Sequence, residues 1–227
     1  MQTNTMLNDD ANVAQPNTLW RQRVQRDCTN TGCVVLHCGL AVNRDTTDVY
    51  RGYAVIEFGH DKQKGYWLRA EMFVDHPVET VFEFFADARQ LERITPPMLN
   101  FKILTPMPVE MKAGLLLDYQ ISIHKIPIKW KTEIAVWDPP FRFVDRQLKG
   151  PYKLWHHEHT FEEIEGRTLV KDVVFYKPIG GALVHKLFVR RDLEKIFCYR
   201  QEKIAEIFRG MRRVPQVADK QLLGAPS

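Results

Sequence analysis

Between residues 115 and 176, five segments in succession place apolar side chains at alternate positions, and this pattern constrains the fold of the 227-residue chain more than any other feature. Alternation of this kind is typical of β-strands that bury one face. Turns containing proline or glycine separate the segments, at residues 125–127, 138–140, 150–151 and 165–166. The pattern therefore predicts an antiparallel meander with one face toward a core and the other toward water.

The segments on either side of the meander complete the predicted fold. A strand over residues 66–74 precedes two short helices, at residues 77–85 and 91–94, and a short strand is expected at residues 101–104. After Gly180–Gly181, apolar side chains at helical spacing predict one helix of about 28 residues. We therefore predict an α+β fold in which a curved antiparallel sheet of about seven strands wraps around a long C-terminal helix.

Composition divides the chain into three parts. Asn, Gln, Thr and Asp dominate the first residues, and no period is sustained before residue 66, so we expect residues 1–65 to form a poorly structured extension. Residues 66–208 form the one predicted domain. Residues 209–227 contain two prolines and two glycines and are expected to be a flexible tail.

Charge and hydropathy limit the classes of function. Residues 66–208 contain 21 basic and 20 acidic side chains, so the predicted domain lacks the basic excess of a nucleic-acid-binding surface. No apolar run approaches the roughly 18 residues that a membrane-spanning helix needs. The polar N-terminus has no apolar signal core. We therefore expect neither a nucleic-acid partner nor a transmembrane segment.

The cysteines favour a reduced protein. Cys28, Cys33, Cys38 and Cys198 do not have the spacing of a disulfide framework, and we expect a cytoplasmic location. The first three cysteines and His37 also lack the paired C-x2-C spacing that is usual at structural zinc sites, so we expect free thiols there.

One segment of the meander carries unusual side chains. Alternation along Trp155–Phe161 places His157 and His159 on the same, mostly apolar face. The two neighbouring predicted strands contribute Asp145 from one side and Asp172 from the other. The full set of polar side chains predicted to point inward comprises Tyr119, Thr132, Asp145, Gln147, His157, His159, Asp172 and Tyr176.

Four interpretations of this polar set are open. The side chains satisfy one another as a hydrogen-bonded core network, or they orient a ligand in a largely apolar pocket. In a catalytic site, His157 or His159 would be a general acid or base, oriented by Asp145 or Asp172. A metal site of the His-x-His kind would need one of these aspartates as its third ligand.

Five short motifs occur in the order of the predicted elements: Pro77–Phe82, Ile94–Pro97, Asp138–Phe143, Gly150–Tyr152 and Trp155–Phe161. With that order, which extends over about residues 66–208, the chain resembles the START-like superfamily, also called SRPBCC. Within it, the motifs are similar to the polyketide cyclase/dehydrase group and to coenzyme-Q-binding START-type proteins. The resemblance implies a helix-grip fold. It specifies the activity less closely, because the superfamily includes lipid carriers, cyclases and dehydratases.

We therefore predict that the domain binds a hydrophobic small molecule, such as a lipid, a quinone or a polyketide-like compound, in an internal cavity between the sheet and the C-terminal helix. The alternative is a cyclase or dehydratase that uses His157, His159, Asp145 or Asp172 as general acid or base. We expect no cofactor and no metal, and transient contact with a membrane is compatible with the sequence. The predicted ligand-binding residues are Tyr119, Trp130, Thr132, Phe143, Asp145, Gln147, Trp155, His157, His159, Asp172, Tyr176 and Phe188.

Overall fold

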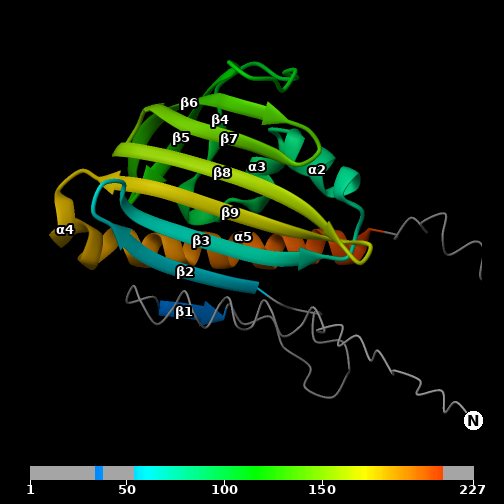
Figure 1. Cartoon of the computed structure of the whole chain (residues 1–227). Helices are drawn as coiled ribbons and strands as arrows, with labels where there is room; N and C mark the ends of the chain where they lie inside the picture. Colours follow the sequence, from blue (N-terminus) through cyan, green and yellow to red (C-terminus); the bar gives the residue numbers. More distant parts are fainter. Residues whose placement is uncertain (1–33, 38–53, 212–227) are drawn as a thin grey trace, which may run out of the picture. The chain divides into compact units, whose positions relative to one another are not determined.

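The computed structural model describes residues 34–37 and 54–211. Strand β1 spans Val34–His37, and a continuous series of elements begins at residue 54 (Figure 1). In chain order these are β2 (Ala54–Asp61), β3 (Gly65–Val74), α2 (Val78–Ala86), α3 (Gln90–Ile94), the 3-10 helix η1 (Pro97–Leu99), β4 (Lys102–Ile103), β5 (Leu116–Ile123), β6 (Ile126–Asp138), β7 (Arg142–Lys149), β8 (Tyr152–Ile164), β9 (Arg167–Pro178), α4 (Gly181–Val184), the π-helix η2 (His185–Val189) and α5 (Arg190–Gly210).

Strands β2 to β9 form one antiparallel sheet in the order β2-β3-β9-β8-β7-β6-β5-β4 (Figure 1). Each strand from β5 to β9 pairs with the next in sequence, so the predicted meander is confirmed. The turns at His124–Lys125 and Glu165–Gly166 have positive φ at both residues, as two-residue hairpins that match the strand twist require. Strand β3 pairs with β9 and thereby connects the start of the domain to the end of its meander.

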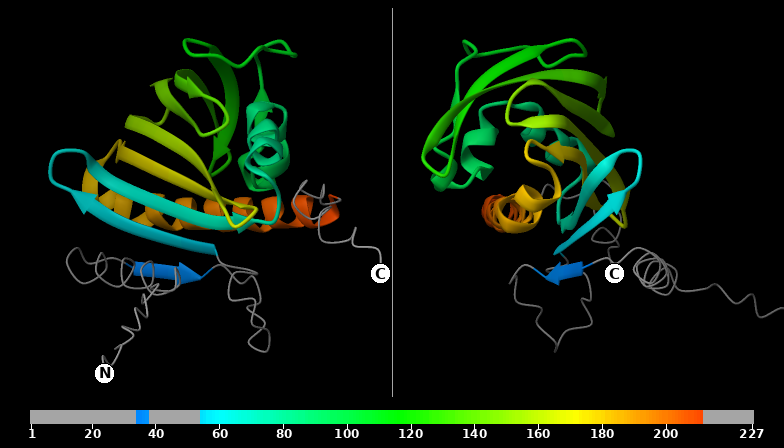
Figure 2. Two further views of the ribbon diagram at one scale, coloured as in Figure 1. Left: turned by 45° about the vertical axis from the view of Figure 1, so that its right-hand side comes forward. Right: turned by 90° about the vertical axis from the view of Figure 1, so that its left-hand side faces the viewer.

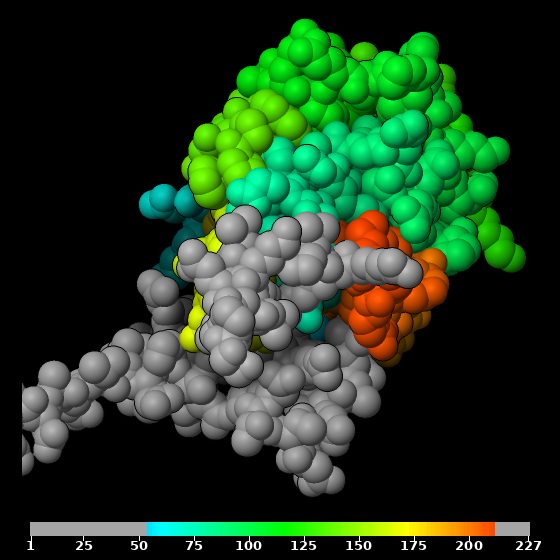
Figure 3. Space-filling model, turned by 90° about the vertical axis from the view of Figure 1, so that its right-hand side faces the viewer, coloured from blue at the N-terminus to red at the C-terminus, as the bar shows by residue number. Residues whose placement is uncertain are grey.

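The helices lie on the concave face of this sheet. The continuous segment α4–η2–α5 crosses that face, and the sheet curls over it (Figure 2). Helix α5 buries side chains at helical spacing in two apolar clusters, one shared with α2 and one shared with β2, β3 and β9. Helix α2 contacts β8 and β9, and α3 contacts α5. In Figure 3 the teal surface of this part of the chain lies between the orange C-terminal part of α5 and the green segments. The predicted α+β helix-grip architecture is therefore confirmed.

Strand β2 corrects the predicted domain boundary and strand number. It pairs with β3 along its whole length, and residues 54–58 are all buried. Because both faces of this stretch are buried, the sequence lacks the alternation that marks a half-exposed strand. The domain therefore begins at or before residue 54, and β2–β9 are eight strands where about seven were expected. Apart from β1, the predicted extension before residue 54 and most of the predicted tail lie outside the described residues.

Cys198 corrects a second expectation. This residue of α5 is disulfide-bonded. The bond contradicts the expectation that the cysteines do not form disulfides, and it removes the argument from cysteine usage for a reducing compartment.

The burial of β2 leads to a prediction about stability. Ile56→Ala should lower the free energy of unfolding by about 2–5 kcal/mol, because it leaves a cavity where a fully buried side chain was. Ile126→Ala is the matched control, since Ile126 at the start of β6 is 65% exposed. Chemical denaturation measures both variants. Equal losses in the two variants would show that residues 54–61 do not belong to the folded domain.

Candidate functional site

A cavity of about 780 Å³ lies between the concave face of the sheet and the helices. Its walls come from the segment between α2 and η1, from strands β5 to β8, and from η2 and α5. The lining is mostly apolar, and it includes the rings of Phe85, Trp130, Trp155 and Phe197. Small-molecule sites in proteins have volumes of about 300–1,000 Å³, so this cavity has the size and character of a ligand pocket.

The structure brings nine of the predicted ligand-binding residues together at this cavity. Strands β5 to β8 contribute eight of them, because alternation points the same face of each strand inward. The ninth, Phe188 of η2, is half exposed and lies where the cavity meets the surface. The nine residues are Tyr119, Trp130, Thr132, Phe143, Asp145, Trp155, His157, His159 and Phe188.

Three predicted residues do not line the cavity. The Gln147 side chain instead donates a 2.7 Å hydrogen bond to the carbonyl oxygen of Tyr152 in the β7–β8 turn. Tyr176 is fully buried in an apolar cluster, and its hydroxyl lies 3.0 Å from Nε2 of His185. Asp172 is buried behind the histidine pair. The prediction placed these three side chains in the cavity wall, and in the structure they lie outside it.

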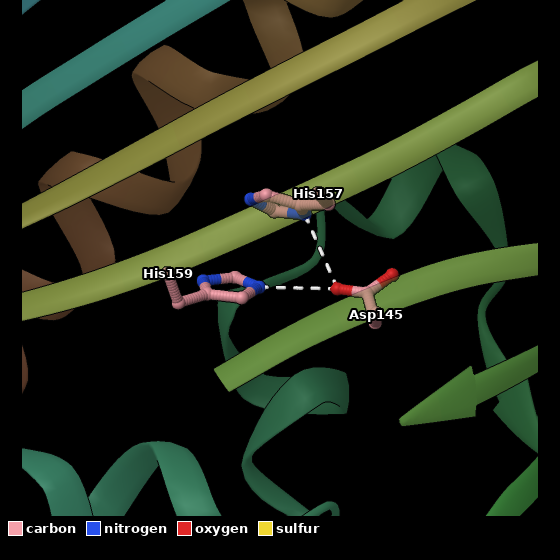
Figure 4. A group of neighbouring side chains, drawn as sticks. All are labelled: Asp145, His157 and His159. Atoms are coloured by element: carbon pink, nitrogen blue, oxygen red, sulfur yellow. Dashed lines mark hydrogen bonds and ion pairs between the residues drawn. The ribbon is translucent and has the colours of Figure 1, made fainter. Parts of the chain in front are cut away.

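Strand register assembles the polar end of the cavity. Asp145 of β7 is opposite His157 of β8, and His159 of β8 is opposite Asp172 of β9. Residues opposite each other on one sheet face have Cβ atoms about 5 Å apart, so the pairing alone places the four side chains in contact. His157 and His159 both point toward Asp145 (Figure 4).

Each imidazole lies between two carboxylates. Oδ2 of Asp145 is 3.1 Å from Nε2 of His159 and 3.5 Å from Nδ1 of His157. Oδ1 of Asp172 is 3.1 Å from Nε2 of His157 and 2.6 Å from Nδ1 of His159. The donor atoms of Asp145, His157 and His159 all lie within 4.8 Å of one another, which makes these three residues a group able to hold a metal ion.

Arg200 of α5 is a site residue that the sequence prediction missed. It lines the cavity, its Nε lies 3.9 Å from Oδ2 of Asp172, and its guanidinium lies over the ring of Phe85. Its helical position three residues after Phe197 and four before Ile204 places it on the buried stripe, and this spacing was the available signal.

Burial and neighbouring charges shift the pKa values of the two histidines in opposite directions. Burial and the charge of His159 lower the pKa of His157 to about 4. Burial also acts to lower the pKa of His159, but the charge of Asp172 and the hydrogen bond that the imidazole donates to Asp145 outweigh it and raise that pKa above its ordinary value. The pair therefore holds its first proton on His159, and His157 is neutral at pH 7.

Both aspartates stay ionised in spite of their burial. Burial acts to raise the pKa of Asp172, but Arg200 and the histidines hold it well below the usual range. Burial acts in the same way on Asp145, and the histidines lower its pKa. The two imidazoles and the Arg200 guanidinium surround the two carboxylates, so each buried charge has a polar partner, as buried ionised groups require.

A second hydrogen-bonded group lies beside this cluster. The hydroxyls of Tyr119 and Thr132 are 2.7 Å apart, and the indole nitrogen of Trp130 donates to the Thr132 hydroxyl at 3.0 Å. Burial raises the pKa of Tyr119, so its hydroxyl keeps its proton and remains a donor. The polar end of the cavity therefore offers both donors and acceptors to a bound molecule.

Comparisons with known proteins agree with this geometry. The family model described as polyketide cyclase / dehydrase and lipid transport matches residues 74–197, more than half of the chain. No curated protein matches the chain.

Solved structures show the same fold at low sequence identity. Protein Ms6760 from Mycobacterium smegmatis has a TM-score of 0.52 and 18% identity, over 68% of this chain and 98% of that one. A protein from Arthrobacter aurescens has a TM-score of 0.52 and 16% identity, over 66% of this chain and 90% of that one. The Zhui aromatase/cyclase from Streptomyces sp. R1128 has a TM-score of 0.51 and 14% identity, over 63% and 93%. At these identities the likeness shows the fold alone.

The lowered pKa of His157 leads to a prediction about pH. The unfolded chain takes up a proton on this imidazole below about pH 6.5, whereas the folded protein does so only near pH 4. The free energy of unfolding should therefore fall as the pH decreases from about 6.5 to 4, by up to about 3 kcal/mol. Urea denaturation across this range, with a chelator present, measures the effect.

His157→Asn should lose this part of the pH dependence. The control, His156→Asn, changes the neighbouring residue on the opposite face of β8 and should keep it. If His157→Asn and the unmodified protein lose stability equally between these pH values, the account of His157 as a buried neutral imidazole is wrong.

Proposed function

Because the chain belongs to the polyketide cyclase/dehydrase and lipid transport family, we propose that it binds an amphipathic hydrophobic molecule, such as a lipid, a quinone or a polyketide-like compound, inside the cavity. The proposal rests on one observation: the cavity has mostly apolar walls, and one part of its wall contains the polar group of Asp145, His157, His159 and Arg200. A ligand with an apolar body and an oxygen-bearing head matches both parts, and neither a sugar nor a fully apolar molecule does so.

The apolar walls would supply most of the affinity. Trp130, Trp155 and Phe143 present aromatic faces to the cavity, and Leu117 and Ile134 add aliphatic surface. Each methylene that moves from water into such a site contributes about 0.8 kcal/mol. A chain of several methylenes or a fused ring system therefore binds well without many hydrogen bonds.

The polar end would fix the orientation of the ligand. The Arg200 guanidinium and the Tyr119 hydroxyl are donors at the cavity surface, and Asp145 is an acceptor there. A carbonyl, phenol or carboxylate oxygen of the ligand fits beside Arg200, since this side chain lies 3.9 Å from Asp172 and has donors left for another partner. Charge-assisted hydrogen bonds of this kind contribute about 1.5–3 kcal/mol each.

The mouth of the cavity supports uptake from a membrane surface. Five apolar side chains of the β5–β6 hairpin and of the segment that follows β9 are each at least 50% exposed, and we call them the mouth patch: Ile126, Ile179, Leu183, Leu187 and Phe188. Two of them, Ile179 and Phe188, also line the cavity. The ring of His124 in the β5–β6 turn lies 5.7 Å from that of Phe188, so the hairpin and the helix meet at the mouth.

Positive charges adjoin the mouth patch. Lys125, Lys186 and Arg191 are exposed beside it, and the nearby carboxylate of Asp192 is paired with His124 at 3.0 Å. Apolar side chains with flanking lysine and arginine favour peripheral contact with an anionic bilayer. Among the described helices, none has the length and apolar content needed to span a membrane.

Proton-transfer catalysis of the cyclase or dehydratase kind is a second candidate function. The observation that favours it is that His157 and His159 both line the cavity and both contact carboxylates that orient them. A bound carbonyl compound would lie within reach of these imidazoles. A ligand recovered chemically unchanged after prolonged incubation supports binding alone, and a cyclised or dehydrated product supports catalysis.

Binding can be tested with cis-parinaric acid, a fluorescent fatty acid with a polyene chain and a carboxylate. We expect saturable binding to the full chain, and we expect Arg200→Met to weaken it by about 10-fold or more, because a charge-assisted hydrogen bond is lost. Arg209→Met, which removes an exposed arginine at the other end of the same helix, is the control and should bind normally. Circular dichroism confirms that each variant is folded.

Mass spectrometry of organic extracts from the purified protein extends this test to natural ligands. An amphipathic hydrophobic compound recovered in stoichiometric amount supports the proposal. Absence of any such compound, together with no saturable binding of cis-parinaric acid, would refute it.

Membrane contact predicts that the mouth patch binds vesicles. The double variant Leu183→Glu/Leu187→Glu should lose co-sedimentation with vesicles of phosphatidylserine and phosphatidylcholine, because it places two charges where side chains enter the bilayer interface. Leu116→Glu is the control, since Leu116 is exposed at the opposite end of β5 from the mouth. If Leu116→Glu weakens sedimentation as much as the double variant, the mouth patch is not the contact surface.

A further inference from the structure

The two carboxylates beside the histidine pair differ in position. Asp145 lines the cavity together with His157 and His159, whereas Asp172 does not line it and is buried on the other side of the rings. In each imidazole ring, one nitrogen faces Asp145 and the other faces Asp172. Nδ1 of His157 and Nε2 of His159 face Asp145, and the remaining nitrogen of each ring faces Asp172.

This arrangement is typical of a metal site, where one carboxylate binds the ion and a second accepts hydrogen bonds from the histidines that bind it. A histidine that binds a metal through one nitrogen almost always donates its other N–H to a carboxylate or carbonyl, which fixes the tautomer and the ring. Asp172 is placed to accept from both rings at once, and Arg200 in turn lies 3.9 Å from Asp172. We propose that His157, His159 and Asp145 bind a first-row divalent metal ion, such as Fe²⁺ or Zn²⁺, in the cavity wall, with Asp172 as the outer partner of both histidines.

The distances between the donor atoms fit this proposal. Ligands about 2.1 Å from a metal ion are about 3.0 Å apart at right angles and about 3.4 Å apart in a tetrahedron. Oδ2 of Asp145 lies 3.1 Å and 3.5 Å from the two histidine nitrogens that face it. No two donor atoms of the group are more than 4.8 Å apart, so small rotations of the side chains complete the site.

The hydrogen bonds of the metal-free cluster are incomplete. Nδ1 of His159 is buried and, although it lies 2.6 Å from Oδ1 of Asp172, it has no hydrogen bond of acceptable geometry among the described residues. A buried polar atom of this kind costs free energy unless something else satisfies it. Rotation of the ring onto a metal ion would let this N–H point at Asp172, and the proton between Nε2 and Asp145 would leave to solvent as the ion binds.

The types of ligand atom indicate which metal ions the site would bind and what a bound ion could do. Two imidazoles and one carboxylate suit Fe²⁺, Zn²⁺, Mn²⁺ and Co²⁺ rather than Ca²⁺ or Mg²⁺, which prefer oxygen ligands. Three protein ligands leave coordination positions open, and these positions face the cavity. An oxygen of a molecule in the cavity would therefore coordinate the ion directly, as a substrate does at a Lewis-acid site.

Cobalt titration tests the metal site directly. The full chain is stripped with a chelator and titrated with Co²⁺, whose visible absorption reports its ligands. We expect one equivalent to bind through nitrogen and oxygen. His157→Asn and His159→Asn should each weaken binding by more than about 100-fold, and Asp172→Asn by about 10–100-fold, as loss of an outer-shell partner does. His156→Asn, on the opposite face of β8, is the control and should bind normally.

Thermal unfolding provides the second readout. Zn²⁺ should raise the Tm of the unmodified protein by mass action and leave the Tm of His159→Asn unchanged. If the histidine variants do not fold without metal, Asp145→Asn is used in their place, and its Tm should likewise not change on addition of Zn²⁺. Absence of saturable Co²⁺ binding would overturn the proposal. So would binding that persists in both histidine variants, or an intense near-ultraviolet thiolate band showing that Cys28, Cys33 or Cys38 holds the ion.

Discussion

The structure depends on one geometric constraint: a sheet that curls around a single helix has more concave surface than that helix can cover. Helix α5 packs against β2, β3 and β9 and meets α2 at its C-terminal part. The concave face of β5 to β8 is left as the wall of a cavity of about 780 Å³. Since the inward faces of these strands form the wall, the alternation of side chains along each strand determines which residues line the cavity.

The polar end of the cavity is stable because its charges are balanced. An isolated carboxylate at this depth would cost several kcal/mol in lost hydration. Asp145 and Asp172 are instead held by the two histidines and Arg200, which come from β8 and α5. A charged group on the cavity surface is therefore already desolvated and oriented before any ligand arrives, which lowers the cost of binding a polar head. The same imidazole and carboxylate groups could either transfer protons or bind a metal ion.

The sequence predicted the meander, the long helix and the association of His157 and His159 with Asp145, because strand alternation and hairpin register are local properties. The sequence did not predict which of the inward-facing side chains reach the surface of the cavity. Tyr176 is fully buried in an apolar cluster and does not line the cavity. A register shift where Lys131 and Thr132 pair with Lys149 and Gln147 marks a bulge at the end of β7, and there Gln147 binds the turn. Arg200 was missed because a buried arginine needs a partner, and its partner Asp172 comes from a distant strand.

The central claim is that the cavity holds an amphipathic molecule with its polar group at the Asp–His–Arg cluster. A crystal structure of the protein, purified without added ligand, measures this most directly. The account predicts continuous density for a non-protein molecule in the cavity, against the walls that include Trp130, Trp155 and Phe197, with a polar atom within hydrogen-bonding distance of Arg200 or His159. It is contradicted if η2 and α5 close onto β5–β8 so that side chains fill the cavity completely.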